Sequence, residues 1–289
     1  MSFSAILVGC PQLPEGDGDE HAVPAALADL GFGVRWASWD EESVDFAAAD
    51  VVVLRASWDY AERREEFLGW CESVPALANA APVVRWNTDK AYLAELIGTG
   101  LPVVPTELVK PGDEARWPGS DFVVKPSVGA GSRGAARFAA GAGEDARAHL
   151  AALHDDGHTA LVQPYQSSVD THGETALVYF GGIYSHAFTK SAMLGAELDA
   201  SGLYLTETLA ATEPAAELRA LAEDTLDAAS ALLGILRAEL LYARVDLVRG
   251  EDGAPLLLEL ELAEPSLGFR HADPGAPLRF ASAVRQQLA

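Results

Sequence analysis

The sequence predicts a mixed α/β protein, with a parallel α/β layer at its N-terminal end and α+β architecture in its C-terminal part. Strand-like apolar runs alternate with helix-like runs over residues 1–100, which is typical of a parallel sheet flanked by helices. A strand, a glycine-rich loop, a strand, a helix and a strand follow over residues 121–165, and two hairpin patterns come after them. With 289 residues, 49% of them apolar, the chain can bury a large core, divided among two domains or three small ones.

The N-terminal elements follow from this alternation. The pattern predicts strands over residues 4–10, 34–40 and 50–57, and helices over residues 22–31 and 65–74. A strand over residues 83–87 and a helix over residues 88–100 would repeat the unit, with Thr88 as N-cap and Gly100 at the C-terminal end. Two prolines within residues 101–109 then mark a domain boundary.

The central and C-terminal elements complete the prediction. Strands are expected over residues 121–126, 135–140 and 159–165, and a helix over residues 143–157. Residues 174–190 predict two strands about the turn Gly181-Gly182, followed by a long helix over 214–235 and a hairpin over 242–262. We therefore expect an N-terminal domain over residues 1–88, a lid subdomain over 89–165 and a C-terminal subdomain over 166–289.

The composition excludes several classes of partner. The chain carries 43 Asp and Glu against 20 Lys and Arg, a formal net charge of -23, so we expect neither nucleic acid nor a membrane surface as a partner. A small anionic ligand then needs a local cluster of cations, backbone N–H groups or a metal. The N-terminus has no basic region and its apolar run is too short for a signal peptide, and Cys10 and Cys71 lack the spacing of a zinc site. These features predict a cytoplasmic protein with packed, reduced cysteines.

Acidic residues gather on the last predicted hairpin. If Asp252-Gly253 forms a two-residue turn, Asp246 lies opposite Glu259 and Arg244 lies opposite Glu261, all four on one face. Opposed like charges destabilise a hairpin unless something positive lies between them, and three carboxylates suit Mg²⁺, or Mn²⁺, better than zinc. The alternative is a solvated polar face on which Arg244 neutralises an acid. The hairpin alone leaves both open.

A second motif is the glycine-rich loop of residues 127–134, which follows the strand that ends near Lys125. Backbone N–H groups near Gly129, Gly131 and Gly134 can approach phosphate oxygens, and Ser127 and Ser132 can add hydroxyl donors. The loop is not a Walker A motif, because the lysine precedes the glycines. It is not a dinucleotide fingerprint either, since a strand follows where a helix should begin. A flexible hairpin connection is the alternative.

The order of these motifs resembles the ATP-grasp superfamily, whose members include D-alanine:D-alanine ligase and glutathione synthetase. The resemblance rests on TDK before a helix, the strand with KP before the glycine-rich loop, a strand ending in QPY, and the run R-x-D…E-x-E-x-x-E-P-S-L. It covers nearly the whole chain, and the segments RASWDY, GIYSHAFTK and ELELAEPSL are similar to those of small ligases of amino-acid and antibiotic metabolism that include the cycloserine-forming ligase.

The resemblance implies roles for named residues. Lys90, Lys125 and Lys190 match basic residues at the nucleotide phosphates, and Ser132 with its glycine neighbours matches the lid loop over the terminal phosphates. Gln163, Pro164 and Tyr165 match the stretch that holds adenine, and Asp170 is the candidate for the ribose hydroxyls, although the family more often has an acid where Gln163-Pro164 stands. Arg244 matches the arginine that stabilises the transferring phosphoryl group. Asp246, Glu259 and Glu261 match the magnesium ligands, Glu261 where many members have Asn.

The activity that the resemblance implies is an ATP-dependent joining of a small carboxylate to an amine through an acyl phosphate, with release of ADP and phosphate. Intramolecular ring closure by the same activation, and a nucleotide-binding protein without catalysis, are the alternatives. A homodimer is common in the family.

Candidate substrate residues follow from position. Arg55, Ser57, Trp58 and Asp59 lie at the carboxyl end of a predicted parallel strand, where open α/β sheets bind ligands, and Arg55 could hold a substrate carboxylate. The alternatives are that Arg55 pairs with a local acid and that Trp58 packs. Glu174 and His186 are further candidates, and the turn Glu264-Pro265-Ser266 would bring Ser266 to the substrate or the acyl phosphate.

Overall fold

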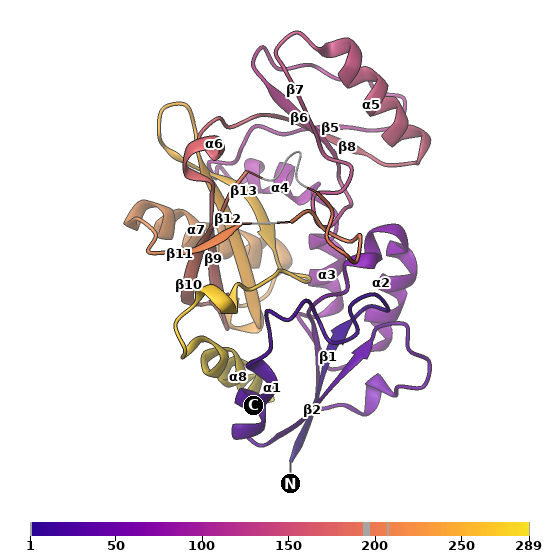
Figure 1. Cartoon of the computed structure of the whole chain (residues 1–289), viewed down its shortest axis with the longest axis vertical. Coiled ribbons are helices and arrows are strands. Elements are labelled where there is room, and N and C mark those ends of the chain that lie inside the picture. The colour runs from indigo at the N-terminus through magenta and orange to yellow at the C-terminus, as the bar shows by residue number, and fades with distance from the viewer. Residues whose placement is uncertain (1, 193–196, 207, 289) are drawn as a thin grey trace.

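The computed structural model of the chain describes residues 2–192, 197–206 and 208–288, and these form three β-sheets with helices packed against them (Figure 1). The three sheets follow one another along the chain in the order parallel, small antiparallel and large antiparallel. Within these ranges no helix has the length and apolarity to cross a bilayer. Cys10 and Cys71 are buried and free, as predicted.

The N-terminal sheet is parallel, with strand order β2-β1-β3-β4. Its strands are β1 (Phe3–Gly9), β2 (Phe32–Ser38), β3 (Val51–Leu54) and β4 (Leu77–Ala78), with helices α1 (Val23–Asp29) and α2 (Arg64–Ser73) between them. Leu7 and Val53 are fully buried because helices cover both faces of such a sheet.

The segment 83–87 is helical, so the strand predicted there is wrong. It belongs to α3 (Ala81–Asn87), in which Pro82 occupies the first turn, where a missing N–H costs nothing. Val83 and Val84 are buried on this helix, so the apolar pair that suggests a strand serves helix packing instead. Thr88 is the C-cap of α3 and not the N-cap of the next helix, α4 (Tyr92–Gly98), which begins after Ala91.

The small antiparallel sheet has strand order β5-β8-β6-β7 and carries the glycine-rich loop between β6 and β7. Its elements are β5 (Glu107–Val109), β6 (Phe122–Pro126), β7 (Ala136–Phe138), α5 (Gly143–Asp155) and β8 (Ala160–Pro164). Leu150 and Leu153 of α5 pack with Phe122 and Val124 in a core of their own, at the end of the molecule farthest from the N-terminus in Figure 1.

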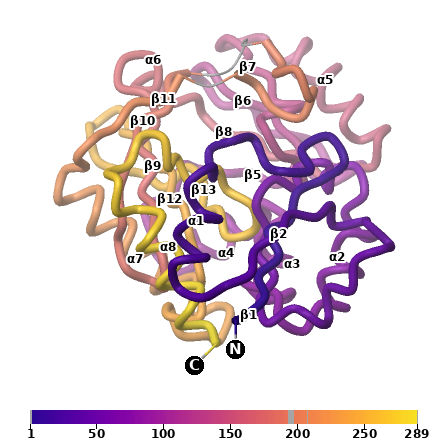
Figure 2. Tube along the Cα trace, turned by 60° about the horizontal axis from the view of Figure 1, so that its bottom comes forward, coloured from indigo at the N-terminus to yellow at the C-terminus, as the bar shows by residue number. Residues whose placement is uncertain are grey.

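The large antiparallel sheet has strand order β11-β10-β9-β12-β13. Its strands are β9 (Glu174–Phe180), β10 (Ile183–Lys190), β11 (Leu209–Thr212), β12 (Tyr242–Arg249) and β13 (Pro255–Glu261), and the helices of this part are α6 (Val169–His172), α7 (Ala216–Leu233) and α8 (Ala276–Gln286). Gly181 and Gly182 form the predicted turn between β9 and β10, with φ values of 56° and 74°. Figure 2 shows α8 beside α1, so the two ends of the chain pack together.

The last hairpin has the predicted pairing for a different reason. Asp246 pairs with Glu259 and Arg244 with Glu261, but near the turn Arg249 pairs with Pro255, which leaves a loop longer than two residues. A bulge at Leu258 inserts one extra residue into β13 and restores the register. The predicted turn was wrong by one residue, and the bulge offsets the error, so all four charged residues share a face.

A buried asparagine joins the N-terminal sheet to the large sheet. Asn79, 1% exposed, donates from Nδ2 to the carbonyls of Tyr242 at 2.9 Å and Leu262 at 2.8 Å, and its Oδ1 accepts from the N–H of Leu241 at 2.6 Å. It therefore fixes the start of β12 against the chain that leaves β13, and with them the strands that carry the acidic residues.

Asn79→Ala is expected to lower the free energy of unfolding by about 3 kcal/mol or more, because each buried backbone group left without a partner costs about 1–3 kcal/mol. Urea unfolding followed by tryptophan fluorescence measures the change. Gln12→Ala, at an exposed residue, is the control and should shift the midpoint little. Equal midpoints for Asn79→Ala and the parent would contradict this bracing role.

Candidate active site

A cavity of about 660 Å³ lies where the three sheets meet. The small sheet contributes Lys125, the large sheet contributes Lys190, Arg244 and Glu259, and the N-terminal part contributes Trp58. The volume is within the usual range for a small-molecule site. Residues far apart in the sequence are thus brought together around one space.

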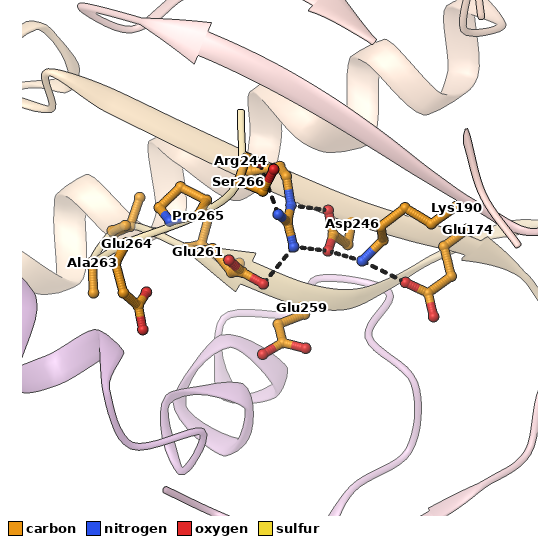
Figure 3. A network of polar contacts seen from close by, with 12 residues as sticks. Glu174, Lys190, Arg244, Asp246, Glu259, Glu261, Ala263, Glu264, Pro265 and Ser266 are labelled. Atoms are coloured by element: carbon orange, nitrogen blue, oxygen red, sulfur yellow. Dashed lines mark hydrogen bonds and ion pairs between the residues drawn. The ribbon is translucent and has the colours of Figure 1, made fainter. Parts of the chain in front are cut away.

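A chain of ion pairs crosses the large sheet beside this cavity (Figure 3). Arg244 makes two parallel contacts with Asp246, each of 2.9 Å, and a third with Glu261 at 2.5 Å. Lys190 Nζ lies 2.6 Å from Asp246 and 2.8 Å from Glu174. The acids of this face are therefore paired with Arg244 of the same hairpin and with Lys190 of β10.

The carboxyl groups respond differently to burial. Burial alone would raise the pKa of Asp246, but Arg244 and Lys190 outweigh it and hold this pKa below its ordinary value. Lys90 and Lys125 likewise hold the pKa of Glu259 down against burial. For Glu261, burial together with Glu259 and Asp246 outweighs Arg244 and raises the pKa to about 8.

Two lysines link the glycine-rich loop to these acids. Lys90 Nζ donates to the carbonyl of Gly129 at 2.7 Å and lies 3.1 Å from Glu259. Lys125 also lines the cavity, and burial lowers the pKa of its amino group. Gly129, Gly131 and Ser132 line the cavity as well, whereas Ser127 is buried and absent from its wall.

The glycine-rich loop is held from both sides. A Cβ at Gly131 would lie 2.4 Å from the carbonyl oxygen of Leu203, so only glycine fits at this close approach. Arg133 donates from Nη1 to Glu62 at 2.7 Å and from Nη2 to the carbonyl of Trp58 at 3.2 Å. The loop therefore spans the cavity between the large sheet's connections and the N-terminal part.

The three acids of the last hairpin have the donor type that a hard metal ion requires. Asp246, Glu259 and Glu261 offer only carboxylate oxygens, which Mg²⁺ prefers, and Glu259 and Glu261 line the cavity. Among the described residues no three Asp, Glu, His or Cys side chains are grouped so that they could hold a metal ion as they stand. The residues fit Mg²⁺ by donor type and by sharing one face, with Lys90, Lys190 and Arg244 among them in the structure.

The other end of the cavity carries the residues expected at a nucleotide base. Gln163, Pro164, Tyr165 and Asp170 line it. Tyr165 donates its hydroxyl to Asp170 at 2.5 Å, and Arg137 stacks 3.6 Å above the Tyr165 ring. The amide of Gln163 donates to Thr106 at 2.8 Å, so its side chain supports the strand. Sequence reasoning missed Arg137, whose only signal was a basic residue on the strand after the glycine-rich loop.

The predicted substrate residues divide into two groups. Trp58, Glu174 and Ser266 line the cavity, whereas Arg55, Ser57, Asp59 and His186 do not. Arg55 is buried, and its guanidinium lies 3.0 Å from Glu20 and 5.1 Å from the centre of the Tyr242 ring. The expectation that it holds a substrate carboxylate is therefore corrected: Arg55 pairs with an acid, as the alternative had it, but that acid is 35 residues away in the sequence.

The remaining members of the second group also have internal partners. Asp59 accepts a hydrogen bond from Trp39 at 2.9 Å, and His186 is bonded to the carbonyl of Leu267 at 2.7 Å. Ser57 is completely buried. Tyr60 and Asp17 also line the cavity, and sequence reasoning missed both. They could not be recognised because they reach the cavity only when the N-terminal part packs against β13.

Comparison with known proteins agrees with this arrangement. The family model described as the N-terminal domain of D-cycloserine synthetase DcsG matches residues 5–81. The whole chain is 40% identical to the cycloserine biosynthesis protein DcsG of Streptomyces lavendulae, with 99% of that protein covered. The crystal structure of D-cycloserine synthetase DcsG matches with a TM-score of 0.90 at 38% identity, covering 99% of this chain and 100% of that one.

More distant structures show the same fold. D-alanine:D-alanine ligase from Bacillus anthracis matches with a TM-score of 0.70 at 14% identity, covering 99% of this chain and 97% of that one. The ATP-grasp ligase PsnB matches with a TM-score of 0.61 at 20% identity, covering 99% and 100%. The fold and the full-length similarity define an ATP-grasp ligase. Within that class, the chain belongs to the family of the cycloserine biosynthesis protein DcsG.

Proposed function

We propose that this ligase transfers the terminal phosphoryl group of ATP to a small carboxylate, and that an amine-type nucleophile then displaces phosphate from the acyl phosphate. The observation that carries the proposal is the cluster of Lys90, Lys125, Lys190 and Arg244 around one cavity in a chain with a net charge of -23. A polyphosphate needs such a local cluster when the overall field opposes it.

We assign the nucleotide to the cavity between the glycine-rich loop and the large sheet. Lys90 and Lys125 would neutralise phosphate oxygens, while Tyr165 and Pro164 would contact the base. Asp246, Glu259 and Glu261 would hold Mg²⁺, which supplies charge neutralisation at the phosphates when bound. Related structures, D-alanine:D-alanine ligase complexed with ATP and PsnB complexed with Mg and ADP, support this choice of ligands.

The chain's own residues would position and shield the reacting groups. Arg244 presents its guanidinium beside Ser266, whose carbonyl it bonds at 2.9 Å, and this places a fixed positive charge where the substrate carboxylate would meet the phosphoryl group. The glycine-rich loop, held by Arg133, would exclude water from the acyl phosphate. No side-chain nucleophile is needed.

Intramolecular ring closure is the second candidate, and the 40% identity to a cycloserine biosynthesis protein favours it. One substrate would carry both the carboxylate and the nucleophile. The activation step is unchanged, because the carboxylate oxygen leaves with phosphate in either case and the nucleophile loses a proton. The two candidates differ only in whether the nucleophile belongs to a second molecule.

Incubation with ATP, Mg²⁺ and a panel of D- and L-amino acids and aminooxy acids is expected to release ADP and phosphate only with the right acid. Mass spectrometry separates the two candidates, because ring closure removes one water from a single substrate whereas ligation joins two. The control omits the acid. Release of AMP and diphosphate would contradict the acyl phosphate route.

A further inference from the structure

The chain that leaves β13 is held at every carbonyl over residues 263–267. Each of these oxygens accepts a hydrogen bond from a different side chain, and the donors come from both the N-terminal part and the large sheet. They are Tyr242 to Ala263 at 2.7 Å, Trp58 to Glu264 at 2.9 Å, Arg55 to Pro265, Arg244 to Ser266 at 2.9 Å, and His186 to Leu267 at 2.7 Å. The loop therefore has a fixed orientation.

This explains three residues that were predicted to contact substrate. Arg55, Trp58 and His186 bind the main chain of the loop rather than a ligand carboxylate, and two of them come from the segment RASWDY. Their role is to position what the loop presents to the cavity, which includes the side chains of Glu264 and Ser266.

Glu264 differs from Glu259 and Glu261, the two acids of β13 that line the same cavity. It is 6% exposed; burial raises the pKa of its carboxyl, and the Tyr60 hydroxyl beside it opposes that rise. Glu259 and Glu261 each have a Lys or Arg nitrogen within 4.0 Å, whereas Glu264 has none among the residues that the structure describes. In Figure 3 it lies on the side of Glu261 away from Lys190 and outside the chain of ion pairs.

A buried carboxylate without a cation is unfavourable, so a cationic group of a ligand would find an unpaired partner here. Glu264 and Ser266 are two residues apart, which spans roughly 7 Å of extended chain, and the Ser266 carbonyl is bonded to Arg244. An amino group at Glu264 and a carboxylate near Arg244 are therefore within the reach of one small amino acid. Nearby Lys90 is already bonded to Glu259 and Gly129.

We propose that Glu264, held in place by Trp58 and Arg55, binds the protonated amino group of the substrate and so selects amino acids over simple carboxylic acids. The proposal deepens the function proposed above and rests on it, because it names the substrate class for the same cavity. Glu264 would contact the substrate directly, and Trp58 and Arg55 would act as positioning residues.

Two ring compounds that differ by one amino group test the assignment without turnover. D-cycloserine carries the amine, and isoxazolidin-3-one is the same ring without it. Calorimetry is done with ADP and Mg²⁺ present, at a pH below the pKa of the amine. The parent protein is expected to bind D-cycloserine about tenfold or more tightly than isoxazolidin-3-one, since a charge-assisted hydrogen bond changes affinity by about one to two orders of magnitude. Equal affinities, or no binding of either compound, would overturn the proposal.

Variants separate recognition from folding. Glu264→Gln is expected to reduce the preference for the amine to within about twofold while ADP binding is kept, and Glu264→Asp should restore part of it, because the charge returns. Glu251→Gln, at an exposed residue of the last hairpin, removes one charge elsewhere and should keep the full preference. Weaker binding of both rings to the same extent in Glu264→Gln would show a structural role and contradict the proposal.

Trp58→Phe tests the positioning residue. It removes the indole N–H that bonds the Glu264 carbonyl but keeps a ring beside Tyr204, 5.0 Å away between ring centres. The preference for the amine should fall about threefold or more, less than in Glu264→Gln, while ADP binding is unchanged. An unchanged preference would contradict the positioning role. Absence of ATP turnover in the panel assay, with the amine preference intact, would contradict the proposed reaction and leave the amine site standing.

Discussion

Glu259→Gln is expected to lower kcat by about a hundred- to a thousand-fold, because a metal ligand contributes several kcal/mol of transition-state stabilisation. Glutamine keeps the size of the side chain and one oxygen acceptor, but it removes the charge that faces Lys90 at 3.1 Å. The variant should therefore fold and still present the cavity, while the ion is held poorly. Phosphate release under saturating ATP and substrate measures the effect, and raising Mg²⁺ should recover part of the loss.

The control for this variant is Glu251→Gln, an equal charge change at an exposed residue of the same hairpin, which should retain parental activity. Thermal unfolding of both variants checks the fold. Near-normal activity of Glu259→Gln at low Mg²⁺ would contradict the assignment of Glu259 as a metal ligand.

Arg244→Lys is expected to reduce kcat by about a hundred-fold or more, although the positive charge is kept. The guanidinium makes two contacts with Asp246, one with Glu261 and one with the Ser266 carbonyl. A lysine amino group is a single point of charge and cannot reproduce this planar set. The hydrogen bond that fixes the Ser266 carbonyl in the loop of residues 263–267 should be lost. The Michaelis constant for the carboxylate substrate should therefore also rise.

Arg249→Lys is the matched control, because Arg249 lies on the same strand beyond the cavity and bonds the Gly253 carbonyl at 2.8 Å. It should keep parental kcat. Equal kcat values for Arg244→Lys and Arg249→Lys would show that the planar guanidinium of Arg244 has no role in the reaction.

Long, locally patterned elements could be predicted because their signals are contained within a few neighbouring residues. Helix α7 and strands β1, β9 and β12 lie where the apolar pattern and glycine turns indicate. The helical structure of residues 83–87 could not be predicted, because two adjacent valines fit a strand or a buried helix equally well. The contribution of Pro82 depends on which elements pack against this segment.

The candidate site likewise contains residues that could be predicted from the sequence and residues that could not. The cross-strand pairs Asp246–Glu259 and Arg244–Glu261 were predicted because pairing follows from the strand register. A bulge at Leu258 offsets the error in the predicted turn. The glycine-rich loop with Lys125 could be read from the order of motifs. Arg55 could not be placed, because its partner Glu20 is 35 residues away and its carbonyl contact is at Pro265.

Residue chemistry and local order along the chain were sufficient for the fold class, the ATP-grasp resemblance and the cluster of acids on one hairpin face. Tertiary packing decided which charged side chains reach the cavity and which are bonded to backbone, because those contacts join residues that lie between 35 and 210 positions apart in the sequence. Arg55 and Glu264 show the difference: Arg55, expected to hold a substrate carboxylate, holds a loop, and Glu264 on that loop lines the cavity with no Lys or Arg ion pair among the described residues.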